Sequence, residues 1–144
     1  MLQSFLQRFS DRHVELQGER LNRMRVGSET IVDLFRDRIN KVMDYSPESL
    51  KTIDDSFMEM REDGVTAKNS PVLLYSFGCY VGEVMVRNLN GRWVRPSRKY
   101  ASKGIANEAI LLPNGIVWNP IGKVEKLLAN GIEDSVVHMY EQAR

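Results

Sequence analysis

The sequence predicts a single α+β domain over residues 1–144, in which helices pack on a small antiparallel sheet. Two observations support this fold class. Apolar residues recur at helical spacing through residues 1–63 and again over residues 72–89, whereas beyond Gly91 they follow the alternation that is typical of strands. We therefore expect N-terminal helices in residues 1–63. Residues 70–144 should hold a buried central helix, about three strands and C-terminal helices.

The first two helices are predicted from apolar stripes. The opening helix should run to about Met24, with Gly18 as a weak point, and its stripe consists of Leu2, Phe5, Leu6, Phe9, His13 and Leu16. Val26 and Gly27 should end this helix, and Ser28 should cap the next one. The second helix should bury Ile31, Leu34, Phe35, Ile39 and Val42, and leave Arg36, Arg38 and Lys41 in solvent.

A third helix is predicted after the start signal Ser46-Pro47-Glu48, with Leu50, Ile53, Phe57 and Met60 inward. Its outer surface is acidic and consists of Asp54, Asp55, Glu59, Glu62 and Asp63. Asp54 and Asp55 should not share a metal ion, because adjacent helical residues point about 100° apart. A solvated face is the favoured interpretation, and a docking surface for a basic partner is the alternative.

The central helix is predicted between the start signal Ser70-Pro71 and the stop signal Asn90-Gly91. One apolar face contains Leu74, Phe77, Val81, Val84, Met85 and Leu89, and a second contains Tyr75, Cys79 and Val86. A helix that is apolar on both sides lies between two layers. Gly78 and Gly82, four residues apart, should let a neighbouring backbone approach closely.

Glu83 is the only acid in this helix. A buried carboxylate needs a partner, and the available partners are Arg87, Arg92 and the indole N–H of Trp93. The favoured interpretation is a structural acceptor. The alternative is a general acid or base beside Tyr75 or Tyr80.

The sheet is predicted from three short alternating segments, Arg92 to Arg95, Glu108 to Leu112 and Ile116 to Trp118. Pro113, Asn114 and Gly115 between the last two are the residues of a bulged hairpin turn. Asn119-Pro120 should then cap a helix from Ile121 to about Leu128. A last helix is expected from Glu133 to about Gln142.

The loop at residues 92–103 combines basic and aromatic side chains, which can hold phosphates and stack on bases. We therefore consider it a candidate nucleic-acid or anion site, composed of Arg92, Trp93, Arg95, Arg98, Lys99, Tyr100 and Lys103. A solvated loop that balances the acidic third helix is the favoured interpretation.

Composition limits the other possibilities. The 20 basic and 19 acidic side chains leave a formal net charge of +1, so no overall field favours nucleic acid or membrane. A single cysteine excludes an internal disulfide, and the N-terminal segment lacks the apolar run of a secretory signal. We therefore expect a cytoplasmic protein that does not bind membranes. No motif for a cofactor, a metal or a catalytic triad occurs, so no cofactor, metal or catalytic residue is predicted.

Three motifs stand out in the second half of the chain: the run from Phe77 to Val84, the run from Leu89 to Val94 and the later segment from Asn119 to Val124. The first two runs contain a Gly-x-x-x-Gly-Glu helix followed by a Gly-x-Trp strand. In these motifs the chain resembles a loosely defined bacterial domain family of unknown function. The resemblance implies a structural unit of Gly78, Gly82, Glu83 and Trp93, and it adds no catalytic residues.

Three functions follow from these patterns. The first is a small non-enzymatic module that binds another protein, for example an immunity-type protein that covers a toxin. The second is nucleic-acid or anion binding through the loop at residues 92–103, and the third is an enzyme that uses Glu83 as acid or base. The sequence favours the first, with another protein as the partner, and does not predict the oligomeric state.

Overall fold

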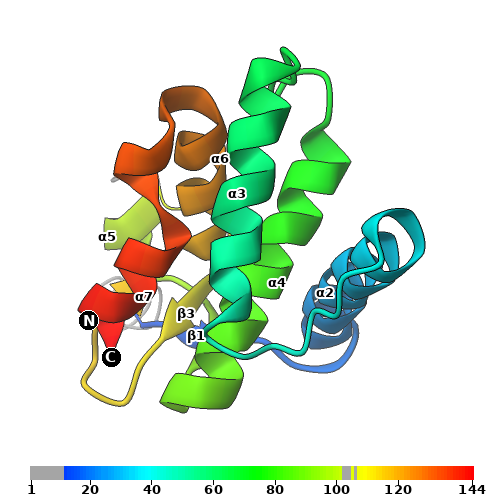
Figure 1. Cartoon of the computed structure of the whole chain (residues 1–144). Helices are drawn as coiled ribbons and strands as arrows, with labels where there is room; N and C mark the ends of the chain where they lie inside the picture. Colours follow the sequence, from blue (N-terminus) through cyan, green and yellow to red (C-terminus); the bar gives the residue numbers. More distant parts are fainter. Residues whose placement is uncertain (1–11, 102–104, 106) are drawn as a thin grey trace, which may run out of the picture.

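The computed structural model describes residues 12–101, 105 and 107–144 (Figure 1). In chain order the elements are β1 (Val14–Glu15), α2 (Gly18–Ile39), α3 (Ser49–Glu62), α4 (Pro71–Leu89), β2 (Arg92–Arg95), α5 (Arg98–Ala101), β3 (Ala109–Leu111), β4 (Val117–Trp118), α6 (Pro120–Asn130), the 3-10 turn η1 (Ile132–Asp134) and α7 (Val136–Ala143). The predicted α+β class is confirmed.

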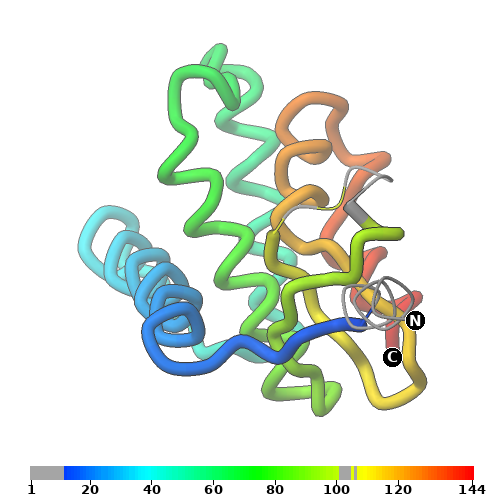
Figure 2. Tube along the Cα trace, turned by 180° about the vertical axis from the view of Figure 1, so that it is seen from behind, coloured from blue at the N-terminus to red at the C-terminus, as the bar shows by residue number. Residues whose placement is uncertain are grey.

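The central helix α4 begins at Pro71 and ends before Asn90, as predicted. Every residue from Ser76 to Met85 is buried, because α4 packs against α2 on one side and against α6 and the sheet on the other (Figure 2). Ser70 does not cap the helix with its side chain, and its carbonyl oxygen instead accepts a bond from the N–H of Leu74 at 3.0 Å.

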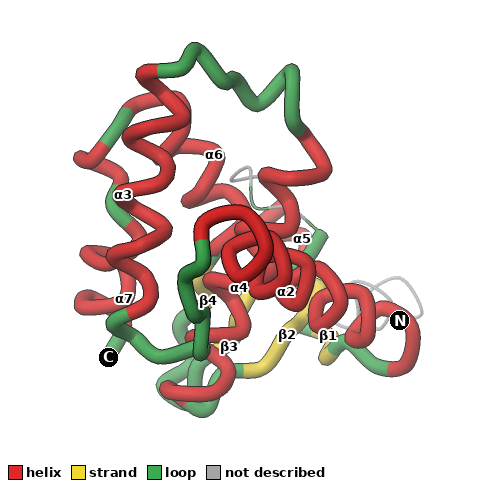
Figure 3. The backbone as a smooth tube through the Cα atoms, turned by 45° about the vertical axis from the view of Figure 1, so that its right-hand side comes forward, coloured by secondary structure: helices red, strands yellow, loops and turns green. Residues whose placement is uncertain are grey.

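The sheet is antiparallel and has the order β1-β2-β3-β4, and Figure 3 shows its short strands lying together at one side of the helices. It has one strand more than predicted, because Val14 pairs with Arg95 and Glu15 with Val94. The predicted hairpin turn is confirmed. Gly115 has a φ of 86°, and its N–H donates to the carbonyl oxygen of Leu112 at 2.9 Å.

The predicted opening helix is wrong for residues 12–17, whereas residues 18–24 are helical as predicted. The segment around Val14 is a strand, and His13 lies outside any helix, where its Nδ1 accepts a bond from the N–H of Ser97 at 3.1 Å. Leu16 is buried as predicted but lies before the helix, and the stripe residues Leu2, Phe5, Leu6 and Phe9 lie outside the described residues. The helix begins at Gly18, whose φ of 57° turns the chain out of the strand.

The predicted break at Val26 and Gly27 is also wrong, since α2 continues through it. A Cβ at Gly27 would lie 2.8 Å from Sγ of Cys79, so this glycine allows α2 to approach α4 closely. Ser28 is fully buried within the helix, and its Oγ donates to the carbonyl oxygen of Arg25 at 2.7 Å.

The end of α2 and the start of α7 differ from the prediction. Ile39 is half-exposed and Val42 is almost fully exposed, because α2 ends at Asn40, which has a φ of 52°. The last helix begins at Val136 and not at Glu133, because Ile132–Asp134 forms a separate 3-10 turn. Within the described residues, no helix combines the length and the apolar character needed to cross a bilayer.

Candidate functional site

The acidic surface predicted on α3 is smaller in the structure, because Asp54 is not part of it. The Asp54 side chain is 4% exposed and accepts bonds from Ser135 Oγ at 2.5 Å and from the N–H of Val136 at 2.9 Å. Its carboxylate therefore holds the start of α7 and cannot dock a partner. Asp55 is exposed and pairs with Lys51 at 2.8 Å, and Glu59 and Glu62 are also exposed.

Glu83 and Trp93 are joined by a buried hydrogen bond, in which Nε1 of Trp93 donates to Oε2 of Glu83 at 2.9 Å. The second carboxylate oxygen, Oε1, lies 3.6 Å from Nη2 of Arg87. A Cβ at Gly82 would lie 2.2 Å from Cζ2 of Trp93, and a Cβ at Gly78 would lie 2.7 Å from the Ile121 backbone. Both glycines are therefore sites of close packing.

The hydroxyl groups of Tyr75 and Tyr80 do not bond to Glu83. Tyr75 donates to Oε1 of Glu108 at 3.1 Å, and the Tyr80 hydroxyl lies 2.7 Å from Oγ of Ser49. Burial, helped by the Glu108 carboxylate, raises the pKa of Tyr75 well above its ordinary range, and burial also raises the pKa of Tyr80. The structure therefore does not assemble the predicted acid–base pair of Glu83 with either tyrosine.

The basic loop does not form one site. Trp93 is 2% exposed, so the predicted stacking of its ring on a base is wrong. Arg92 lies 3.6 Å from Glu15 and lines a cavity beside Glu83. Tyr100, at the far end of the loop, lies beside His13 with ring centroids 5.1 Å apart.

The remaining basic residues of this loop, Arg95, Arg98 and Lys99, are exposed, and Lys103 lies outside the described residues. In the described part of the chain, no three side chains of the His, Cys, Asp or Glu type lie close enough together to hold a metal ion.

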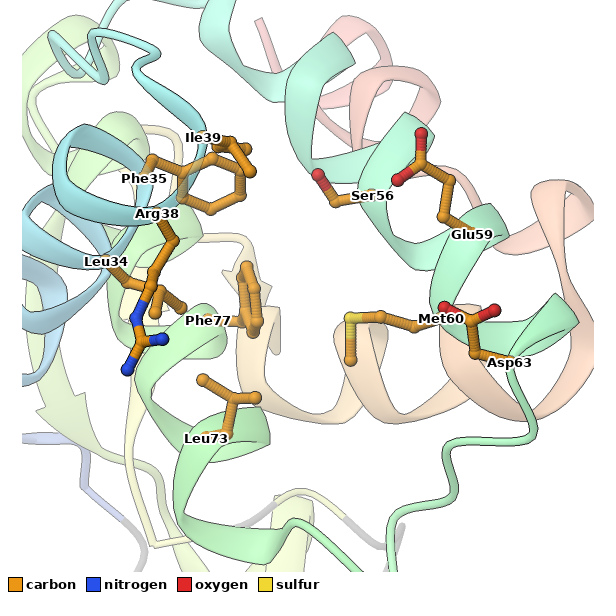
Figure 4. Close-up of a pocket in the computed structure, with 10 residues that line it drawn as sticks. All are labelled: Leu34, Phe35, Arg38, Ile39, Ser56, Glu59, Met60, Asp63, Leu73 and Phe77. Atoms are coloured by element: carbon orange, nitrogen blue, oxygen red, sulfur yellow. The ribbon is translucent and has the colours of Figure 1, made fainter.

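A groove between three helices is the feature that the sequence did not reveal. We name it the α2–α4 groove, and it has a volume of about 240 Å³. Its floor is the start of α4, one wall is the end of α2 and the other wall is α3 (Figure 4). The apolar residues that line it are Leu34, Phe35, Ile39, Met60, Leu73 and Phe77.

Packed aromatic rings support the floor of the α2–α4 groove. Phe77 makes edge-to-face contacts with Phe57, at a centroid distance of 4.8 Å, and with Phe35, at 6.0 Å. Figure 4 shows Met60 pointing from α3 across the groove toward Phe77. Phe35 and Phe77 are buried, whereas Ile39 at the rim is 50% exposed.

The two walls of the α2–α4 groove carry opposite charges. Arg38 lies on the α2 wall, and Glu59 and Asp63 lie on the α3 wall (Figure 4). None of the three forms an ion pair with another described residue. Their charges are therefore available to a molecule that enters the groove.

Sequence analysis placed most of these residues on the correct helices but did not bring them together. Ile39 was predicted to be buried, but it is 50% exposed at the rim of the α2–α4 groove. Arg38 and Glu59 were interpreted separately as solvated charges, because their position across a common groove depends on how α2 and α3 pack.

Comparisons of the chain with protein-family models, with curated proteins and with solved structures found no match. The resemblance to a bacterial domain family therefore stays a prediction.

Proposed function

We propose that the chain is a small protein-binding module, and that the α2–α4 groove receives an amphipathic helix of a partner protein. The observation that carries this proposal is an open apolar groove whose two walls bear opposite, unpaired charges. Grooves of this kind bind the apolar face of a helix through side chains spaced three and four residues apart.

The apolar lining supplies the attraction in this proposal. Fully burying an isoleucine side chain contributes roughly 1.5–3 kcal/mol, and half of the Ile39 surface is still exposed, so a partner can gain part of this free energy. Met60, Leu73 and Leu34 are partly exposed and add to the same surface. Met60 also supports recognition of different apolar side chains, because methionine adapts its shape.

The charges define which helix fits. A partner helix should carry acidic residues on the flank that faces Arg38, and basic residues on the flank that faces Glu59 and Asp63. Charge pairs at the rim of an interface mainly select the partner and its orientation, while the buried apolar contacts supply most of the affinity. A toxin with such a helix would make the chain an immunity-type protein.

Two isoleucines provide a matched test. Ile39 is 50% exposed at the α2–α4 groove, and Ile132 is 58% exposed on η1, outside the groove. Wild-type protein, Ile39→Glu and Ile132→Glu should each be used to capture partners from a lysate of the source cells. We expect one protein that wild type and Ile132→Glu retain and that Ile39→Glu binds at least about tenfold more weakly, a loss of about 1.4 kcal/mol.

The charge prediction is tested on the captured protein. Replacing Arg38 with Glu should weaken its binding, and an acid-to-Lys change on the partner helix should restore the binding of the Arg38→Glu variant. Equal binding by the wild type and Ile39→Glu, or no specific partner for the wild type, would contradict the proposal.

A further inference from the structure

A second cavity lies at the opposite end of the α2–α4 helix pair. It has a volume of about 360 Å³ and lies between the start of α2, the end of α4 and strands β1 and β2. We name it the arginine cavity, because three arginines from three elements line it: Arg25 of α2, Arg87 of α4 and Arg92 of β2. The α2–α4 groove shares no lining residue with it.

The three guanidinium groups differ in how they are held. Arg87 is fixed, because its guanidinium lies 3.5 Å from the centre of the Tyr45 ring and 3.6 Å from Glu83. Arg92 is half-exposed and lies 3.6 Å from Glu15, beyond hydrogen-bond distance. Arg25 forms no ion pair with any residue that the structure describes, so its side-chain charge is unmatched.

The two acids that line the arginine cavity do not balance the charge of its three arginines. Glu83 is buried, accepts a hydrogen bond from the Trp93 indole at one oxygen, and forms an ion pair with Arg87 at the other at 3.6 Å. Glu15 is half-exposed and pairs with Arg92. With two acids against three arginines, the lining has one positive charge in excess, and among the described residues Arg25 has no acid paired with it.

The remaining walls are apolar and consist of Leu16, Leu21, Val86 and the buried Trp93. A guanidinium group donates two parallel hydrogen bonds to a carboxylate or phosphate, and arginine is the common residue for such sites. A volume of about 360 Å³ lies in the range of small-molecule sites, which combine apolar walls with a few placed polar groups.

We propose that the arginine cavity binds a small organic oxyanion, in which a carboxylate or phosphate monoester is attached to an apolar body. The oxyanion contacts Arg25 and Arg92, and the apolar body lies against Leu21 and Val86. Arg87 stays over Tyr45 and provides a positive charge that is already in place before the ligand enters, which reduces the entropy lost on binding.

The Trp93 indole offers a direct probe, because its N–H bonds to Glu83 at the cavity floor. The indole N–H resonances of Trp93 and Trp118 should be followed by NMR in the full chain while phenyl phosphate, phenylacetate or benzyl alcohol is added. Trp118 is an internal control, because it lies outside the arginine cavity. The two anions distinguish a phosphate head from a carboxylate head, and the alcohol has the same ring without a charge.

We expect a saturable shift of the Trp93 resonance with at least one of the two anions at concentrations up to about 10 mM, and none with benzyl alcohol. Arg25→Gln and Arg92→Gln should each weaken this binding about tenfold, whereas Arg36→Gln, an exposed change elsewhere on α2, should leave it unchanged. Three results would overturn the proposal: no saturable Trp93 shift with either anion, equal binding of the alcohol, or full affinity in both cavity variants.

Discussion

Gly82 leaves the space in which the Trp93 indole lies, and this contact links the middle of α4 to strand β2. The ring of Trp93 is 2% exposed, and its N–H donates to Glu83, one residue after Gly82 in the chain. Because protein interiors are packed as closely as organic crystals, an added methyl group here has no space to occupy. The absence of a side chain at Gly82 thus allows α4 and the Trp93 ring of β2 to pack this closely.

Replacing Gly82 with Ala should destabilise the protein by about 1–3 kcal/mol, because the new Cβ would lie 2.2 Å from Cζ2 of Trp93 and the indole must shift away from Glu83. Urea denaturation of the purified variant measures this change in the free energy of unfolding.

A double-mutant cycle separates this clash from other effects of alanine. Trp93→Leu removes the ring that the Cβ would meet, at its own cost in buried surface. We expect the Gly82→Ala and Trp93→Leu double variant to lose less stability than the sum of the two single variants. Strict additivity would show that Gly82 and Trp93 are not coupled.

At the scale of secondary-structure elements, one buried carboxylate joins α3 to α7. Asp54 accepts bonds from the Oγ of Ser135 and from the N–H of Val136, and the Ser135 side chain in turn accepts from the N–H of His138. The first N–H groups of a helix have no partner within the helix, so they need acceptors of this kind. The Asp54 side chain therefore ties the start of α7 to α3, in addition to the buried apolar residues of α7.

Asp54→Ala should cost roughly 1–3 kcal/mol, because it leaves buried donors of Ser135 and Val136 without an acceptor. Asp55→Ala is the matched control, since Asp55 is exposed and its pair with Lys51 is a surface pair, so the change should stay within about 0.5 kcal/mol. Thermal unfolding of both variants gives the comparison. Similar losses in the two variants would refute the assigned role of Asp54.

Elements that depend on local signals were predictable from the sequence. The start of α4 at Pro71, the hairpin turn at Gly115 and the Asn119 cap of α6 each depend on residues within one turn of chain. Strand β1 was not predictable in this way, because its pairing with β2 joins residues far apart in the chain. Gly27 was interpreted as a helix end for the same reason, since only the packing on Cys79 explains it.

The candidate sites were less predictable than the elements. Asp54 and Asp55 are adjacent and chemically identical, and only the tertiary structure makes one a buried cap and the other a surface charge. Both cavities lie between α2 and α4, which the sequence separates by more than thirty residues, roughly the span from Ile39 to Pro71. Their lining can be recognised only when these two helices are seen side by side.

At the scale of the whole molecule, one apolar core extends from Leu16 to Ala143, and α4 lies at its centre. This core also contains ionisable groups that must stay neutral while the chain is folded. Burial, helped by the carboxylates of Glu108 and Glu83, raises the pKa of the Cys79 thiol to about 12, and Tyr75 beside it shifts in the same direction. The free energy of unfolding should therefore depend on pH through these two residues of α4.

Stability should therefore fall as the pH rises above about 9, the ordinary pKa of the Cys79 thiol being 9.0. Below this value the thiol is protonated in both states and its raised pKa costs nothing, whereas above it only the unfolded chain releases the proton, which favours unfolding. Each such group contributes a slope of roughly 1.4 kcal/mol per pH unit until the pH passes its folded pKa. Urea denaturation at a series of pH values from neutral to 11 measures the slope, and Cys79→Ala should make it shallower. Ser76→Ala, a buried change without a titrating group, should lower stability equally at every pH, and an unchanged slope in Cys79→Ala would contradict the link.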